Sequence, residues 1–188
     1  MAMKNSIRSE IVADGRNVVR WKYKVIMTDK IFAENRGIDP DALTKQIREL
    51  LKIDQLIIVP AEPGDMFGHT DEIVRFIEEK TVLLNDYGKI DPTFGEEVDS
   101  TLKKAGLEIV PFPYYLSIFN SFVNMSAVGC YINFLQVNGL VLVPTFSIKS
   151  DDEALRIAEI VFTDSKGLPI DCGTLAPEGG VLNWTFCR

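Results

Sequence analysis

Histidine is almost absent from this chain: His69 is the only one among 188 residues. Long apolar runs are lacking as well, and the sequence has no leader in which a charged segment is followed by an apolar one. We therefore expect neither a membrane span nor a signal peptide. Cysteine is scarce, and the spacings of Cys130, Cys172 and Cys187 match no metal site. We therefore expect a reducing, cytoplasmic setting, and neither a metal ion nor a cofactor.

Positive charge is also in short supply. The chain has 20 lysine and arginine residues against 27 aspartate and glutamate residues, a formal net charge of -7. Nucleic acid and anionic membranes are not expected as partners, because binding phosphate needs a cationic face. An acidic balance suits a cationic ligand, although many acidic proteins bind none. The 46% of hydrophobic residues suffice for a core, and the length fits one domain.

The single histidine lies in the stretch Gly68-His69-Thr70-Asp71-Glu72, just before an apolar run at 73–77. If this stretch is a strand, alternate residues point the same way, and His69 and Asp71 face one side together. Such a pair is suited to holding a cationic substrate and moving a proton. A structural histidine beside a surface acid is the commoner explanation of so short a motif.

A unit of strand, strand, helix and strand occurs three times, at a period of roughly 50 to 60 residues. The first unit is predicted to have strands at 17–21, 24–28 and 55–59 and a helix at 39–52. The second has strands at 71–77, 81–85 and 107–110 and a helix at 91–105. The third has strands at 131–137, 140–144 and 168–171 and a helix from 150 to near 162. Further strands are expected at 7–12 and 181–186.

Each unit alone buries too little apolar surface, so the units must pack on one another. This pattern favours a propeller-like or stacked repeat fold of the α/β class, and an open α/β sandwich of duplicated units is the alternative. We place the repeats of a single domain at 11–60, 69–113 and 129–172, and a closing strand at 180–187.

Four stretches, in order, resemble the bacterial peptidylarginine deiminase and agmatine deiminase family of guanidino-group-modifying proteins: 11–19, 68–72, 131–144 and 170–183. In the first stretch, Arg16 stands where the family usually has a glycine. The resemblance implies the pentein fold, a five-bladed α/β propeller with the active site at its centre. This chain resembles its three C-terminal blades, so we expect an incomplete propeller of about three ββαβ repeats.

The resemblance also implies a chemistry. In the family, a cysteine thiolate attacks the guanidinium carbon, a histidine transfers protons, and two carboxylates hold the guanidinium. By resemblance His69 is the proton shuttle, Asp71 is one of the carboxylates, and Asn133 binds substrate. A hydrogen-bonded strand amide is the alternative for Asn133. The implied ligand is agmatine, arginine or an arginine side chain, and agmatine would connect the chain to putrescine biosynthesis.

Two departures from the family pattern concern activity. The family segment Trp-x-Arg-Asp-x-Gly-Pro, which supplies the other carboxylate, does not occur in this sequence. The nucleophile loop of the family ends in cysteine. Here residues 179–183 are followed by Trp184, which takes the cysteine position if no gap is assumed. Alternatively, a three-residue deletion has removed the cysteine and two neighbours. Cys187 is an outside candidate for the nucleophile, while Cys130 and Cys172 are expected to be structural.

We therefore expect a deiminase-family protein that is inactive or weakly active by itself, a pseudoenzyme. A non-catalytic guanidinium-binding or assembly module, or one part of a split deiminase, are the alternatives. Because the outermost repeats present strand edges that need cover, we also expect a homo-oligomer or pairing with another chain.

Overall fold

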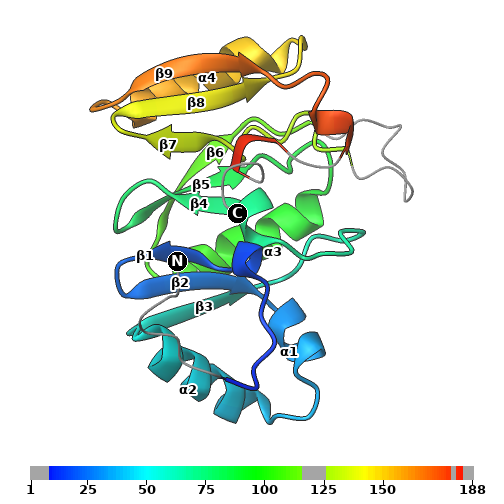
Figure 1. Ribbon diagram of the computed structural model, residues 1–188, viewed down its shortest axis with the longest axis vertical. Coiled ribbons are helices and arrows are strands. Elements are labelled where there is room, and N and C mark those ends of the chain that lie inside the picture. Colours follow the sequence, from blue (N-terminus) through cyan, green and yellow to red (C-terminus); the bar gives the residue numbers. More distant parts are fainter. Residues whose placement is uncertain (1–8, 116–125, 179–180, 184–188) are drawn as a thin grey trace, which may run out of the picture.

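The computed structural model describes residues 9–115, 126–178 and 181–183, and three small sheets form its framework (Figure 1). In each sheet the first two strands are antiparallel and the last two are parallel. The first unit has β1 (Val19–Trp21), β2 (Lys24–Thr28), α2 (Pro40–Leu51) and β3 (Gln55–Val59). The second has β4 (Val74–Phe76), β5 (Thr81–Asn85), α3 (Pro92–Lys104) and β6 (Glu108–Phe112). The third has β7 (Leu135–Val137), β8 (Leu140–Thr145), α4 (Ser150–Val161) and β9 (Lys166–Asp171).

Local sequence signals explain the helix boundaries. The Asp39 side chain accepts hydrogen bonds from the backbone N–H groups of Asp41 and Ala42 at the start of α2. Asp91 does the same for Phe94 N at the start of α3, and both helices begin with proline. These caps satisfy N–H groups that have no partner within the helix. The threefold repeat and its helices are thus confirmed, and the strands at 24–28, 55–59 and 81–85 have the predicted bounds.

In the stack of units, α3 lies between the first and second sheets, and α4 packs on β8 and β9 (Figure 1). One face of the first sheet packs against α2 through Leu43 and Ile47. Its other face packs against α3, whose side chains also contact the second sheet. The far face of the second sheet, including Leu83 and Phe112, packs into the third unit. In the first and second sheets, the face directed at the next unit is therefore covered by that unit, as expected for repeats that share cores.

Several predicted elements differ in the structure. Residues 9–12 form no strand, because the Asn35 side chain accepts from Val12 N and donates to Val12 O in place of a strand partner. The predicted strand at 71–77 is shortened to β4, preceded by a 3-10 helix, η2 (Thr70–Glu72). The strand at 131–137 is shortened to β7, because Asn133 N donates to Cys130 O in a buried turn.

A short helix that the sequence pattern did not predict, α1 (Lys30–Glu34), follows β2. Two further 3-10 helices are η1 (Gly15–Asn17) and η3 (Ala176–Glu178). Most of the predicted closing strand lies outside the described residues, and Leu182 and Asn183 have helical backbone. No helix in the described part of the chain is long and apolar enough to cross a membrane.

Candidate functional site

The candidate site forms where η1 of the first unit meets η2 of the second. The chain enters η2 through Gly68, which has φ of +59°. A Cβ added there would lie 2.7 Å from Lys30 Cδ, so the lysine side chain would have to shift, and the backbone conformation itself favours glycine. Thr28 Oγ1 donates to Gly68 O at 2.8 Å and ties this turn to the end of β2. The turn sets the direction in which the next residues project.

Asn17 holds the two 3-10 helices together. Its fully buried side chain accepts a hydrogen bond through Oδ1 from Thr28 N at 2.7 Å, and Thr28 Oγ1, which donates to Gly68 O, lies 2.9 Å from the same atom. The same atom accepts from Thr70 Oγ1 at 2.5 Å. Because one amide oxygen serves donors from both units, the position of η1 relative to η2 is fixed by buried polar contacts.

His69 lies at the start of η2 with 8% of its side chain exposed. Its Nε2 is 3.1 Å from Asp14 Oδ2, and its Nδ1 is 3.8 Å from Glu72 Oε1. Burial lowers the pKa of His69, but the contacts with Glu72 and Asp14 outweigh burial and the nearby Arg16 charge, and the net pKa is raised. The imidazole is therefore held between two carboxylates that favour its protonated form.

Arg16 places its guanidinium against the acidic residues of η2. Its Nε lies 3.3 Å from Asp71 Oδ2, and its Nη2 donates to Glu72 Oε1. The side chains of Arg16 and Asp71 are 18% and 8% exposed. Burial raises the pKa of Asp71 and Arg16 offsets part of that effect, whereas for Glu72 contacts with His69 and Arg16 outweigh burial and lower the pKa. A guanidinium thus lies between two carboxylates, a geometry suited to its array of N–H donors.

The third unit is connected to this cluster through Asn183, which follows that unit in the chain. Its side-chain amide donates to Asp71 Oδ2 at 2.8 Å, and its backbone N–H donates to Asn133 Oδ1 at 2.9 Å. Asn133 is fully buried, and its Nδ2 has no hydrogen-bond partner among the described residues. Asn133 is therefore connected to the carboxylate cluster through Asn183, and all three units contribute to the site.

The structure brings His69 and Asp71 together, but through a different local backbone conformation than the predicted strand. His69 and Asp71 belong to a 3-10 turn, so the strand geometry proposed for them is wrong, but ligand atoms of His69, Asp71 and Glu72 all lie within 4.8 Å of one another. The sequence pattern missed the parts played by Asp14, Glu72 and Asn183. Asn183 belongs to a stretch that resembles the family, but its long-range partners leave no local signal. Trp184 and Cys187 lie outside the described residues.

The same three side chains offer nitrogen and oxygen donors of the kind that bind metal ions. However, Arg16 already contacts two of them, and a cation in that position opposes a second positive charge. The arrangement therefore fits a guanidinium better than a metal ion.

The two described cysteines are poor nucleophiles. Cys130 and Cys172 are free and buried. Burial, together with the charges of Glu72, Glu62 and Asp71, raises the pKa of Cys130 well above its ordinary value, and burial also raises the pKa of Cys172. Since the thiolate is the reactive form, both thiols remain protonated and unreactive near neutral pH. The prediction that they are structural agrees with these surroundings.

A second acidic group lies close to the site. Glu62 accepts hydrogen bonds from the hydroxyls of Tyr87 and Tyr114, each at 2.9 Å. Burial raises the pKa of Glu62 to about 7, with further contributions from Asp65 and Glu72, although the two tyrosines oppose the shift. Glu62 is therefore partly protonated at neutral pH, which limits the negative charge beside the candidate site.

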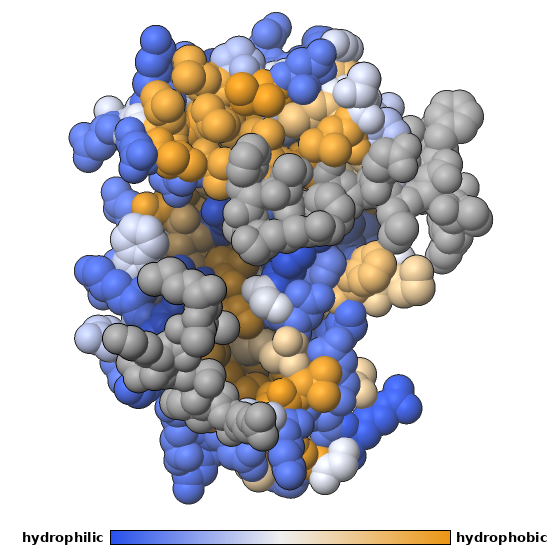
Figure 2. Space-filling view, in the orientation of Figure 1, coloured by the Kyte–Doolittle hydropathy of each residue, from blue (hydrophilic) through white to orange (hydrophobic). Residues whose placement is uncertain are grey.

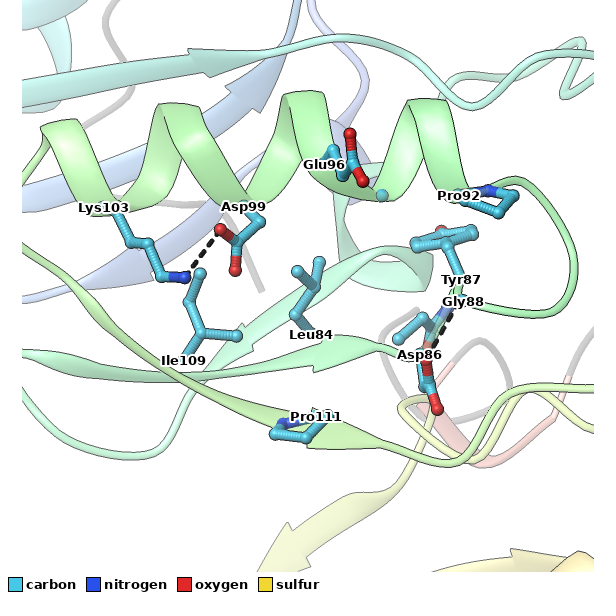
Figure 3. Close-up of a pocket in the computed structure, with 12 residues that line it drawn as sticks. Leu84, Asp86, Tyr87, Gly88, Pro92, Glu96, Asp99, Lys103, Ile109 and Pro111 are labelled. Atoms are coloured by element: carbon cyan, nitrogen blue, oxygen red, sulfur yellow. Dashed lines mark hydrogen bonds and ion pairs between the residues drawn. The ribbon is translucent and has the colours of Figure 1, made fainter.

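A separate open cleft of about 330 Å³ lies between α3 and the strands β5 and β6 (Figure 3). Polar side chains of α3 border it, and Lys103 Nζ pairs there with Asp99 Oδ2 at 2.8 Å. His69, Asp71 and Asn133 do not line this cleft. We therefore assign no role in the candidate site to it.

Comparison with solved structures identifies the fold as that of the pentein class. The agmatine deiminase of C. jejuni matches with a TM-score of 0.77 and 18% identity, over 93% of this chain and 54% of that one. A putative arginine deiminase from Porphyromonas gingivalis matches with a TM-score of 0.77 and 24% identity, over 90% and 54%. An inosamine-phosphate amidinotransferase from Streptomyces griseus matches with a TM-score of 0.58 and 18% identity, over 96% and 47%.

Residues 9–183 match the family model described as Porphyromonas-type peptidyl-arginine deiminase, and the chain belongs to this family. The predicted family and the pentein-type α/β fold are thereby confirmed. The chain spans about half the length of the solved structures that it matches. No curated protein sequence matches it.

Proposed function

We propose that this chain binds guanidinium groups at the cluster of His69, Asp71 and Glu72 and does not hydrolyse them by itself. The observation that carries the proposal is the pair of carboxylates that holds a guanidinium, that of Arg16, between the first and second units. Paired carboxylates match the planar array of guanidinium donors, which a lysine or an alkylammonium ion does not reproduce.

In this proposal Asp71 and Glu72 hold the cation, and His69 is the group able to move a proton beside it. Asn183 orients Asp71 through the bond to Oδ2, and Asn133 in turn holds Asn183. A carboxylate fixed by an amide loses little conformational freedom when a ligand binds, which favours recognition. The ligand class is a small guanidino compound or an arginine side chain.

Two considerations support a chain without catalytic activity of its own. The described thiols, Cys130 and Cys172, are buried and protonated. Counted without a gap, Trp184 stands where the family has its nucleophile, and an indole cannot attack a guanidinium carbon; counted with a three-residue deletion, that position also holds no cysteine.

Ammonia release from agmatine, free arginine and an arginine-containing peptide tests the lack of catalysis. We expect no release above a protein-free blank with any of the three. Release would contradict the proposal, and a Cys187→Ala variant would then show whether Cys187 supplies the thiolate. Release lost in that variant and kept in Cys172→Ala would identify Cys187 as the nucleophile.

A second feature favours assembly. One face of the third sheet carries five apolar residues: Leu135, Val137, Leu142, Leu168 and Ile170. By strand register, this face corresponds to the face of the first sheet that carries Val19, Trp21, Ile26, Ile57 and Val59. In the first sheet this face is packed against α3. In the third sheet Val137 and Ile170 are 43% and 36% exposed, and Figure 2 shows apolar residues gathered over β8 and β9.

We propose that this face binds a second copy of the chain. The exposed side of α2 carries polar residues, among them Asp41, Lys45 and Arg48, so it offers no apolar stripe to cover the open sheet. A contact between two copies of the same face is self-complementary and closes after two chains. The proposal predicts a dimer in solution.

A further inference from the structure

The guanidinium that lies in the candidate site belongs to the chain itself. Arg16 is 18% exposed, its Nε is 3.3 Å from Asp71 Oδ2, and its Nη2 donates to Glu72. These contacts use the two carboxylates on which the proposed binding of guanidino compounds depends. A free ligand and Arg16 would therefore need the same oxygen atoms.

We propose that Arg16 is an internal ligand, which fills the guanidinium site and excludes free guanidino compounds until its side chain is removed or turned away. The inference rests on the proposed guanidinium-binding function, and it concerns which group controls access of free ligands to Asp71 and Glu72. In the native chain, the Arg16 guanidinium occupies that site.

The backbone around Arg16 keeps this ligand in place. Asp14 Oδ1 accepts a hydrogen bond from Arg16 N at 2.9 Å, which caps η1. The next residue, Asn17, is held by hydrogen bonds from Thr28 N and Thr70 Oγ1. The Cα of Arg16 is therefore fixed, and release of the site requires only rotation of its side chain.

A tethered ligand competes strongly with a free one. Short tethers give an effective concentration on the order of millimolar, and a fixed backbone with the side chain already directed at the site raises it further. A small guanidino compound with a dissociation constant near 1 mM for the open site would therefore bind the native chain at least tenfold more weakly.

Asp14 connects the internal ligand to His69. One carboxylate oxygen of Asp14 accepts from Arg16 N, and the other lies 3.1 Å from His69 Nε2. The position of the arginine and the position of the imidazole are thus set by one side chain. Loss of the Arg16 side chain leaves the backbone bond to Asp14 intact, so removing the guanidinium leaves the histidine in place.

The test is rescue by a small guanidine. Arg16→Ala and the native chain are titrated with methylguanidine by calorimetry, and their Tm values are measured with and without about 10 mM of the compound. We expect Arg16→Ala to bind at least tenfold more tightly than the native chain and to gain roughly 3 °C in Tm. Methylammonium at the same concentration is the control cation, and it should produce neither effect because it lacks the planar donor array.

Arg16→Met is a second variant that keeps the aliphatic packing if the alanine variant folds poorly. Equal binding of methylguanidine by the native chain and by both variants would overturn the internal-ligand proposal and leave guanidinium binding intact. Absence of binding by folded variants would overturn the proposed guanidinium-binding function itself. The variants are also tested with the additional change Asp71→Asn. If they still bind methylguanidine, the ligand lies elsewhere, and the proposed binding at Asp71 is contradicted.

Discussion

Asn183 and Asp71 are 112 residues apart in the sequence, and the amide of Asn183 donates to Asp71 Oδ2 at 2.8 Å. The same oxygen accepts from Arg16 Nε at 3.3 Å. A residue that follows the third unit, and is bound to Asn133 of that unit, therefore shares an acceptor with a residue of the first unit, on a carboxylate supplied by the second. The geometry of the site consequently depends on how the three units stack.

Asn183→Ala is expected to lower the free energy of unfolding by about 1–3 kcal/mol, because a buried carboxylate loses one of its donors. Urea denaturation at neutral pH measures the change. Gln136→Ala, on the exposed part of β7, is the control and should lie within about 0.5 kcal/mol of the native chain. An equal effect of both substitutions would mean that the Asn183 contact adds no stability.

The titration of His69 is directly observable, since one histidine gives one imidazole signal in an NMR spectrum. We expect its pKa to exceed that of a histidine side chain in an unfolded chain, because the carboxylates of Glu72 and Asp14 outweigh burial. Asp14→Asn should lower this pKa, whereas Asp152→Asn, at an exposed position on α4, should leave it unchanged. A pKa at or below about 6.5 in the native chain would contradict the contacts described.

The sign of the His69 effect on stability follows from the raised pKa. The folded chain binds the imidazole proton more tightly than the unfolded chain does. The stabilisation is fully present below the unfolded pKa, about 6.5, and is lost as the pH rises through the folded pKa.

Glu62 should make stability fall as the pH rises through neutrality. Its folded pKa of about 7 lies above the ordinary value of 4.5, so the folded chain retains this proton where the unfolded chain has lost it. The free energy of unfolding of the native chain is expected to fall by roughly 3 kcal/mol between pH 4.5 and pH 8 through this group, and Glu62→Gln should not show that loss. Unfolding measured at both pH values, with Glu96→Gln on the exposed side of α3 as control, decides the matter.

Asn17→Ala is expected to cost about 2–4 kcal/mol, because it leaves two buried donor groups, Thr28 N and Thr70 Oγ1, without this acceptor. Gln46→Ala on the exposed face of α2 is the surface control. If Asn17→Ala unfolds at the same urea concentration as the control, the side chain does not join the first two units.

The open face of the third sheet predicts a change in oligomeric state. Ile170→Lys and Val137→Lys should convert the expected dimer into a monomer, because a charge cannot be buried unpaired in an apolar contact. Ile160→Lys is a matched control, since Ile160 is 61% exposed but lies on α4. Sedimentation velocity gives the readout, and a native chain that is monomeric at every concentration would contradict the interface.

Regular elements were predictable because their signals are local. Pro40 and Asp39 mark the start of α2, and alternating or continuous apolar residues mark β2, β3 and β5. The segment around His69 was mistaken for a strand, since a positive φ at Gly68 and the N–H to C=O bonds of η2 leave no periodic pattern. Local polar contacts replaced strand pairing there.

The candidate site was predictable only in part. His69 and Asp71 could be identified from a short motif with a family resemblance, and they do lie close together. The contact of Arg16 with Asp71 bridges 55 residues and depends on how two units stack, which residue spacing does not encode. For Asn183, family resemblance marked the stretch, and only the fold reveals its partners.

Asp14 and His69 come from separate repeats and Asn183 follows the third repeat, so the cluster cannot exist in any one of them. During folding, each repeat can form its own local hydrogen bonds early, whereas these long-range contacts close last. The chemical shift of the lone imidazole is therefore a gauge of how the first two units join, because its partners Asp14 and Glu72 come from those two units.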